Sequence, residues 1–99
     1  MKTSDCCNSI EEIRSEIDRI DKEIISLLGE RFQYVKAIVA FKEPSKEGIV
    51  AQDRYNAVIA SRRALAEECG LDANLIEKLY RGIMDHFIEE EMKIINLKK

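Results

Sequence analysis

The sequence predicts an all-α protein whose chain forms three long helices. Apolar residues recur at helical spacing through most of the chain, and no segment shows the alternation of a β-strand. The 99 residues include only four Gly and one Pro, so turns are few and the elements must be long. With 45% hydrophobic and 35% charged residues, the composition is that of one globular domain covering residues 1–99.

The first helix is expected over residues 10–42. Ser9 and Glu12 are spaced as in a capping box, which marks a helix start. Pro44 disfavours a helical conformation in the residue before it, and this ends the element. Between these limits two apolar rows follow a heptad spacing. The rows consist of Ile10, Ile17, Ile24 and Ile38, and of Ile13, Ile20, Leu27, Tyr34 and Phe41.

Two further helices are expected after a loop at residues 43–50. One runs over residues 51–69 and the other over residues 73–97. Gly70 provides the C-terminal stop of the second helix, because Gly readily adopts the left-handed conformation found there. Asp72 provides an N-terminal cap for the third helix.

The length of the first helix predicts a homodimer. A helix of about 33 residues is roughly 50 Å long at ~1.5 Å per residue. A compact domain of this size is only about 35 Å across. Two shorter helices cannot cover an apolar face of that length, so we expect a second copy of the chain to complete an intertwined homodimer. A monomeric hairpin with a frayed end is the alternative.

Charge and composition exclude several classes of protein. The net charge is −3 with acids and bases mixed, whereas a nucleic-acid partner requires a basic face. No apolar run approaches the ~18 residues of a membrane span, and no apolar signal segment follows Met1–Asp5. We therefore expect a cytoplasmic protein with no membrane partner. Cys6, Cys7 and Cys69 lack metal-ligand spacing, and the chain has a single His, so no metal site is expected.

Charged residues at positions where the pattern demands apolar ones indicate a small-molecule site. Arg31 interrupts an apolar row and cannot lose its charge, so an anion should meet it there. Lys42 lies eleven residues on, which returns to almost the same face of a helix. Arg54 and Glu91 have apolar helical neighbours on the second and third helices. Arg14 lies on a flank of the first helix that would reach the partner's pocket in a dimer.

Inward cations together with one inward carboxylate are typical of a site for a small molecule with more than one negative charge. Arg in particular binds carboxylates bidentately, which fixes orientation. Simpler interpretations remain open. Arg31 could meet a protein carboxylate or extend to the surface, and Lys42 and Arg14 could be solvated. Glu91 could form a salt bridge with Arg31 or Arg54. The residues alone therefore predict a dianion-binding helical dimer and no particular reaction.

Motifs that match a known pattern are spread over nearly the whole chain. They are Ile13-Arg14, Ile17-Asp18-Arg19-Ile20-Asp21, Leu28-Gly29-x-Arg31, Tyr34-Val35-Lys36-Ala37, Phe41-Lys42, Arg54 and the third-helix segment ending at Glu91. Together these motifs resemble the all-helical chorismate mutase family, and within it the isochorismate-pyruvate lyase branch. Each motif is weak singly, and the combination is fairly specific.

The resemblance implies an intertwined three-helix homodimer with two equivalent sites for a dicarboxylate such as isochorismate or chorismate. One chain would supply Arg31, Lys42, Arg54 and Glu91, and the other would supply Arg14. The family's reactions are pericyclic and use no cofactor, so the protein would hold a reactive conformer and stabilise charge on the ether oxygen. Lys42 and Glu91 would act at that oxygen, while Arg14 and Arg31 would bind the carboxylates.

Two positions favour the lyase over the mutase. Mutases typically carry a Glu directly after the Arg54 equivalent and a small hydroxyl residue four positions before the inward Gln or Glu. This chain has Tyr55 and Phe87 there. The resemblance therefore implies conversion of isochorismate to salicylate and pyruvate, with weak conversion of chorismate to prephenate. A dedicated mutase and a non-catalytic dimerisation or regulatory module are the alternatives. Glu91 departs from the lyase pattern, which has Gln.

Overall fold

The computed structural model describes residues 9–42 and 44–98, and nearly all of them are helical. The chain divides into two compact units, Met1–Tyr34 and Val35–Lys99. The described residues contain no strand, which confirms the all-α prediction. None of the helices in this part of the chain has the length and apolarity needed to cross a membrane. Cys6 and Cys7 lie outside the described residues.

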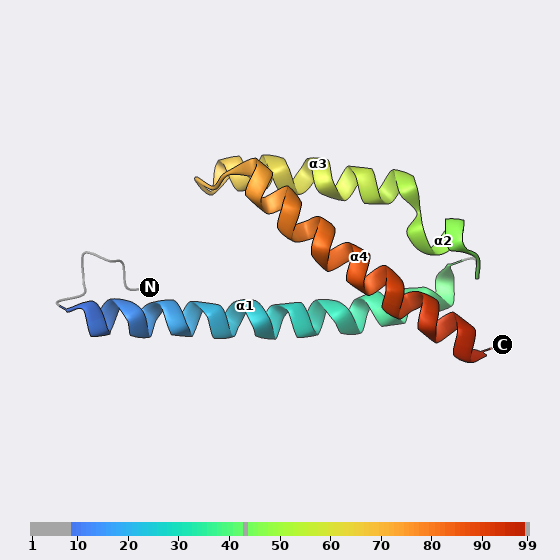
Figure 1. The fold of residues 1–99 in the computed structure, drawn as a ribbon, viewed down its shortest axis with the longest axis horizontal. Coiled ribbons are helices and arrows are strands. Elements are labelled where there is room, and N and C mark those ends of the chain that lie inside the picture. Colours follow the sequence, from blue (N-terminus) through green and yellow to red (C-terminus); the bar gives the residue numbers. More distant parts are fainter. Residues whose placement is uncertain (1–8, 43, 99) are drawn as a thin grey trace. The chain divides into compact units, whose positions relative to one another are not determined.

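Helix α1 (Ile10–Ile38), which Figure 1 labels, begins where the capping box predicted. Its last four residues belong to the second unit. The Ser9 hydroxyl accepts a hydrogen bond from the Glu12 backbone N–H at 3.2 Å. This contact satisfies one of the N–H groups that have no partner within the first turn of a helix. The predicted start of the first helix is therefore confirmed.

The end of α1 differs from the prediction. The α-helix stops at Ile38, and a 3₁₀ helix, η2 (Val39–Phe41), follows it. Lys42 then has an extended backbone, with φ −94° and ψ 148°. The expectation that Lys42 continues the helical face of Arg31 is thus wrong. Val39 is buried, and its packing into the core of the second unit outweighs the helical preference of the local sequence.

The predicted loop at residues 43–50 contains a short helix, α2 (Lys46–Val50). The Ser45 side chain caps it by accepting a hydrogen bond from the Gly48 backbone N–H at 3.0 Å. The helix ends at Ala51, whose φ of 46° and ψ of 67° lie in the left-handed region. Helix α3 (Gln52–Glu68) begins directly after this residue. A left-handed Ala between two helices is a local backbone strain that the surrounding structure must hold in place.

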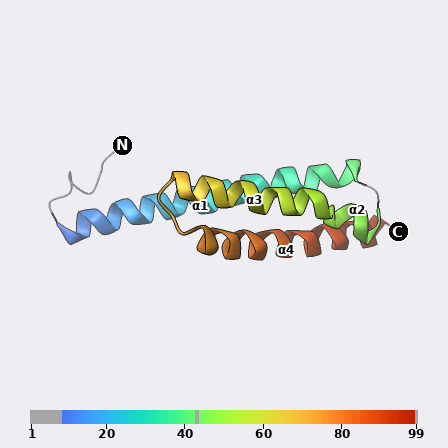
Figure 2. The same ribbon diagram turned by 90° about the horizontal axis from the view of Figure 1, so that it is seen from above.

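Helices α3 and α4 (Ala73–Lys98) form a hairpin, which Figures 1 and 2 show as two adjacent helices joined at one end. Gly70 ends α3 with φ 76°, and the Leu71 N–H bonds to the Ala66 carbonyl at 2.8 Å. This is a Schellman turn, which needs a left-handed residue at the Gly position. The Asp72 carboxylate then caps α4 by accepting from the Asn74 N–H at 2.7 Å. Both predicted helix-end signals are confirmed.

The buried core lies in the second unit and has two clusters. One joins α3 to α4 through Tyr55, Val58, Ile59 and Met84. The other joins η2, α2 and α4 through Val39, Ile49 and Ile95. Helix α1, by contrast, contains no buried residue.

Candidate active site

Lys42 and Glu91 form a partly buried ion pair in the second unit. The Lys42 ammonium Nζ donates to Glu91 Oε2 at 2.9 Å and to the backbone carbonyl of Ile49 at 2.8 Å. The side chains are 20% exposed for Lys42 and 6% for Glu91. The prediction that Glu91 faces inward is confirmed, and its ion-pair partner within the second unit is Lys42, where the sequence suggested Arg31 or Arg54.

Three elements meet at this ammonium group. Lys42 follows η2 in extended conformation, Glu91 comes from α4, and Ile49 comes from α2. Ile49 is fully buried, so its backbone is fixed by core packing. A Lys ammonium has three N–H donors, and these two acceptors occupy two of them. Because the pair is largely removed from water, a charge developing beside it would interact with it strongly.

Arg54 lies in the first part of α3 and is exposed, whereas the next residue, Tyr55, is buried. The sequence placed Arg54 on an apolar side of its helix, and the structure of the single chain differs from that expectation. Among the described residues Glu91 forms its ion pair with Lys42 and none with Arg54. Its exposed guanidinium is available to a ligand or to another chain.

Arg14 and Arg31 both lie on α1, in the unit Met1–Tyr34. Arg14 is exposed and Arg31 is half-buried. The two residues are 17 positions apart on this helix. Their grouping with Lys42 and Glu91 around one ligand stays a prediction.

Sequence reasoning missed the structural role of Tyr55. Its hydroxyl donates to Asp85 Oδ1 at 2.7 Å, and the residue is only 7% exposed. Burial raises the pKa of Tyr55 above its usual value, and the hydrogen bond to Asp85 raises it further. The spacing of Tyr55 to the buried Val58 and Ile59 is that of one helix face, and this signal would have found it.

Sequence reasoning also missed a carboxylate that ties α3 to α4. Glu77 accepts from Arg81 at 2.8 Å and from Arg63, on the opposite helix, at 2.7 Å. Hydrogen bonds from Arg81 and then from Arg63 hold the pKa of Glu77 below its usual range. These side chains are partly exposed, so the contacts fix the register of the hairpin more than they stabilise it.

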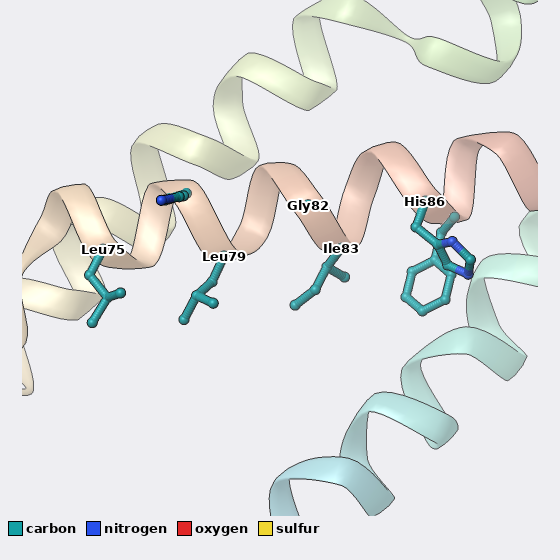
Figure 3. A pocket seen from close by; sticks show the side chains of 7 residues that line it. Leu75, Leu79, Gly82, Ile83 and His86 are labelled. Atoms are coloured by element: carbon teal, nitrogen blue, oxygen red, sulfur yellow. The ribbon is translucent and has the colours of Figure 1, made fainter.

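An apolar groove runs along one face of α4. Figure 3 shows Leu75, Leu79 and Ile83 projecting to the same side of the helix. Leu75 and Leu79 are 49% and 53% exposed, which leaves much apolar surface uncovered. The lining is completed by Lys78, Gly82, His86 and Phe87. Such a surface fits another helix better than it fits a dicarboxylate.

The sequence of this chain is similar to those of known proteins. The sequence pattern of the chorismate mutase type II family matches residues 13–92. An isochorismate pyruvate lyase of Pseudomonas aeruginosa is 43% identical over 93 residues, which cover 94% of this chain and 91% of that protein. A T-protein of Haemophilus influenzae is 36% identical over 76 residues, covering 77% of this chain but only 20% of that longer protein.

A third relative, a chorismate mutase of Methanocaldococcus jannaschii, is 29% identical over 75 residues, covering 76% of each chain. The family match includes Arg14, Arg31, Lys42 and Arg54 and ends just beyond the buried Glu91. From the match over most of its length, this chain belongs to the chorismate mutase type II family.

Proposed function

We propose that this protein is an isochorismate-pyruvate lyase, which converts isochorismate to salicylate and pyruvate. The observation that carries the proposal is the buried contact between Lys42 and Glu91, which sets an ammonium and a carboxyl group at one point. The relative from Pseudomonas aeruginosa, which bears the name of this activity, supports the choice of reaction because it matches almost the full chain.

The reaction is a pericyclic elimination. A ring hydrogen moves to the methylene carbon of the enolpyruvyl group while the ether C–O bond breaks, so no nucleophile, external base or cofactor takes part. Negative charge develops on the ether oxygen as that bond breaks. The remaining N–H of Lys42 would donate to this oxygen, and a protonated Glu91 would donate a second hydrogen bond.

The two substrate carboxylates require cations. Arg31 and Arg14 would bind them bidentately, and Arg54 would add positive charge at the edge of the site. Holding both carboxylates restricts the substrate to the conformer in which hydrogen and methylene carbon are close, and such restriction is a large part of catalysis in reactions of this type.

A homodimer would complete the site, with Arg14 coming from the second chain. Its support is the uncovered apolar surface of α1, where Ile17, Ile24 and Leu27 are 50%, 49% and 62% exposed. An apolar row of this length is typical of a protein–protein interface. The groove on α4 is a second surface that the partner chain would cover.

Weak chorismate mutase activity would accompany the lyase activity. The family match and the relative from Methanocaldococcus jannaschii support a mutase reaction. Tyr55 weighs against a dedicated mutase, because its hydroxyl is committed to Asp85 and it brings no carboxylate to bind a ring hydroxyl. The lyase is therefore the main activity that we propose.

The test is to incubate the purified protein separately with isochorismate and with chorismate. We expect salicylate and pyruvate to form in equal amounts from isochorismate, and prephenate to form much more slowly from chorismate. Faster formation of prephenate would favour a dedicated mutase. Formation of neither product would favour a non-catalytic module.

A further inference from the structure

The second partner of Lys42 is a backbone carbonyl from the last turn of a helix. Ile49 lies within α2 (Lys46–Val50), and its carbonyl oxygen accepts from Lys42 Nζ at 2.8 Å. In an uninterrupted helix this oxygen would accept from the backbone N–H four residues on. That N–H belongs to Asp53, in the next helix, and the hydrogen bonds between α2 and α3 do not include this pair. The carbonyl is therefore free to hold a side chain.

Ala51 is the reason that the helical hydrogen bond is lost. Its φ of 46° turns the chain between α2 and α3. The Ala51 N–H still bonds to the Glu47 carbonyl at 2.9 Å, and the Ala51 carbonyl accepts from Tyr55 at 2.9 Å. The break is therefore confined to a single residue that ends one helix and starts the next. Strained backbone of this kind persists where the surrounding structure imposes it, and it is frequent at functional sites.

We propose that the left-handed Ala51 is a positioning residue, which directs the Ile49 carbonyl to Lys42 and so aims the lysine's remaining N–H at the substrate. The catalytic part of this inference rests on the proposed function. Glu91 alone would leave the ammonium group free to rotate about one contact. The carbonyl adds a second fixed acceptor, and its position is set by the fully buried Ile49 side chain.

The inference predicts that activity depends on whether residue 51 tolerates a positive φ. Gly and Asn adopt the left-handed region readily, whereas a β-branched residue does not. We expect Ala51→Gly and Ala51→Asn to keep kcat within about twofold of the parent value, and Ala51→Val to lower kcat about tenfold with little change in KM. Ala64→Val, at an exposed position of α3, is the matched control for adding a β-branched residue and should behave as the parent.

A second experiment observes the Lys42 ammonium group in the absence of substrate. With ¹⁵N-labelled Lys, the Lys42 ammonium signal in an NMR spectrum should be protected from exchange with water in the parent, Ala51→Gly and Ala51→Asn proteins. The signal should be lost in Ala51→Val, while the remaining signals keep the dispersion of a folded protein. Lys42→Met assigns the signal by removing it.

The outcomes separate the two proposals. A protected signal in Ala51→Val, or an equal loss of kcat in all three Ala51 variants, would overturn the positioning role. If the protein shows no lyase activity but the ammonium signal follows the tolerance for positive φ, the proposed function fails and the positioning of Lys42 stands.

Discussion

Helix α1 and the α3–α4 hairpin differ in how their apolar residues are covered. The hairpin buries Tyr55, Val58 and Met84 between its two helices. Helix α1 buries none of its residues, although its apolar pattern is the more regular of the two. The second unit thus contains its own core, whereas the described residues give the apolar rows of α1 no such cover.

The difference teaches that the two regions have different tasks. The second unit can hold Lys42 against Glu91 with its own packing. Helix α1 carries Arg14 and Arg31, the cations proposed to bind carboxylates, on a helix whose exposed apolar rows call for another chain. In the proposed function the dimer would supply substrate binding, and the single chain would supply the pair of Lys42 and Glu91.

The largest effect is expected when charges are placed on the apolar rows of α1, which tests whether another chain covers them. Ile17→Glu with Ile24→Glu would bury carboxylates in the proposed interface, and should weaken association at least about 10³-fold. Ser15→Glu with Lys22→Glu has the same seven-residue spacing on the opposite side of the helix and is the control. Sedimentation velocity and salicylate formation measure the effect. Unchanged association of the Ile variant would refute the proposed interface.

Replacing Lys42 tests the role of the second unit. Lys42→Met should lower kcat/KM for isochorismate about 10²-fold, because one hydrogen bond to the ether oxygen is lost. It should also destabilise the protein by about 3 kcal/mol, since Glu91 is left buried without its partner. Lys93→Met removes a lysine that pairs with Glu90 at 3.1 Å on the surface, and should change neither quantity. Activity equal to the parent in Lys42→Met would remove Lys42 from the mechanism.

Glu91 sharpens the comparison through the effect of pH. An ionised carboxylate can only accept a hydrogen bond, whereas the amide of Glu91→Gln donates at every pH. We expect Glu91→Gln to give a flatter dependence of kcat/KM on pH than the parent, because the hydrogen bonding of an amide does not change with pH. Glu90→Gln, one residue away, is the control and should keep the parent's profile. Parallel profiles for the parent and Glu91→Gln would exclude Glu91 as a donor.

The smallest expected effect concerns the hairpin itself. Tyr55→Phe removes the hydrogen bond to the exposed Asp85 and should lower the free energy of unfolding by about 1 kcal/mol. The pKa of Tyr55 is raised in the folded protein by burial, so its contribution is complete below the usual value of 10.0 and is lost as the pH rises through the raised value. Tyr34→Phe, at a 71% exposed residue, is the control. Thermal unfolding at neutral and alkaline pH measures the difference, and a constant difference at all pH values would contradict it.

The helix ends that the sequence predicts correctly are those with local signals. Ser9, Gly70 and Asp72 act through hydrogen bonds to residues a few positions away, and the structure contains these contacts. The end of α1 was not predicted, because it depends on the packing of Val39 with Ile95, a residue distant in sequence. Helix α2 was not predicted, although the Ser45 hydroxyl that caps it accepts from a backbone N–H only three residues away.

The candidate site was predicted only in part, because it too depends on contacts between residues distant in sequence. Apolar neighbours on every side of Glu91 indicated burial, and the residue is 4% exposed. Its partner could not be predicted, because the position of Lys42 depends on where α1 ends. The carbonyl of Ile49 had no sequence signal, since it becomes available through the backbone conformation of Ala51.

The tight connection between α3 and α4 has a consequence for the order of folding. The salt bridge of Arg63 with Glu77 spans only 14 residues, whereas Lys42 and Glu91 are 49 residues apart. Closing a short loop loses less chain entropy, so the hairpin is expected to form first. During refolding, recovery of enzymatic activity should therefore lag behind recovery of helical circular dichroism, because the contact between Lys42 and Glu91 closes a much longer loop.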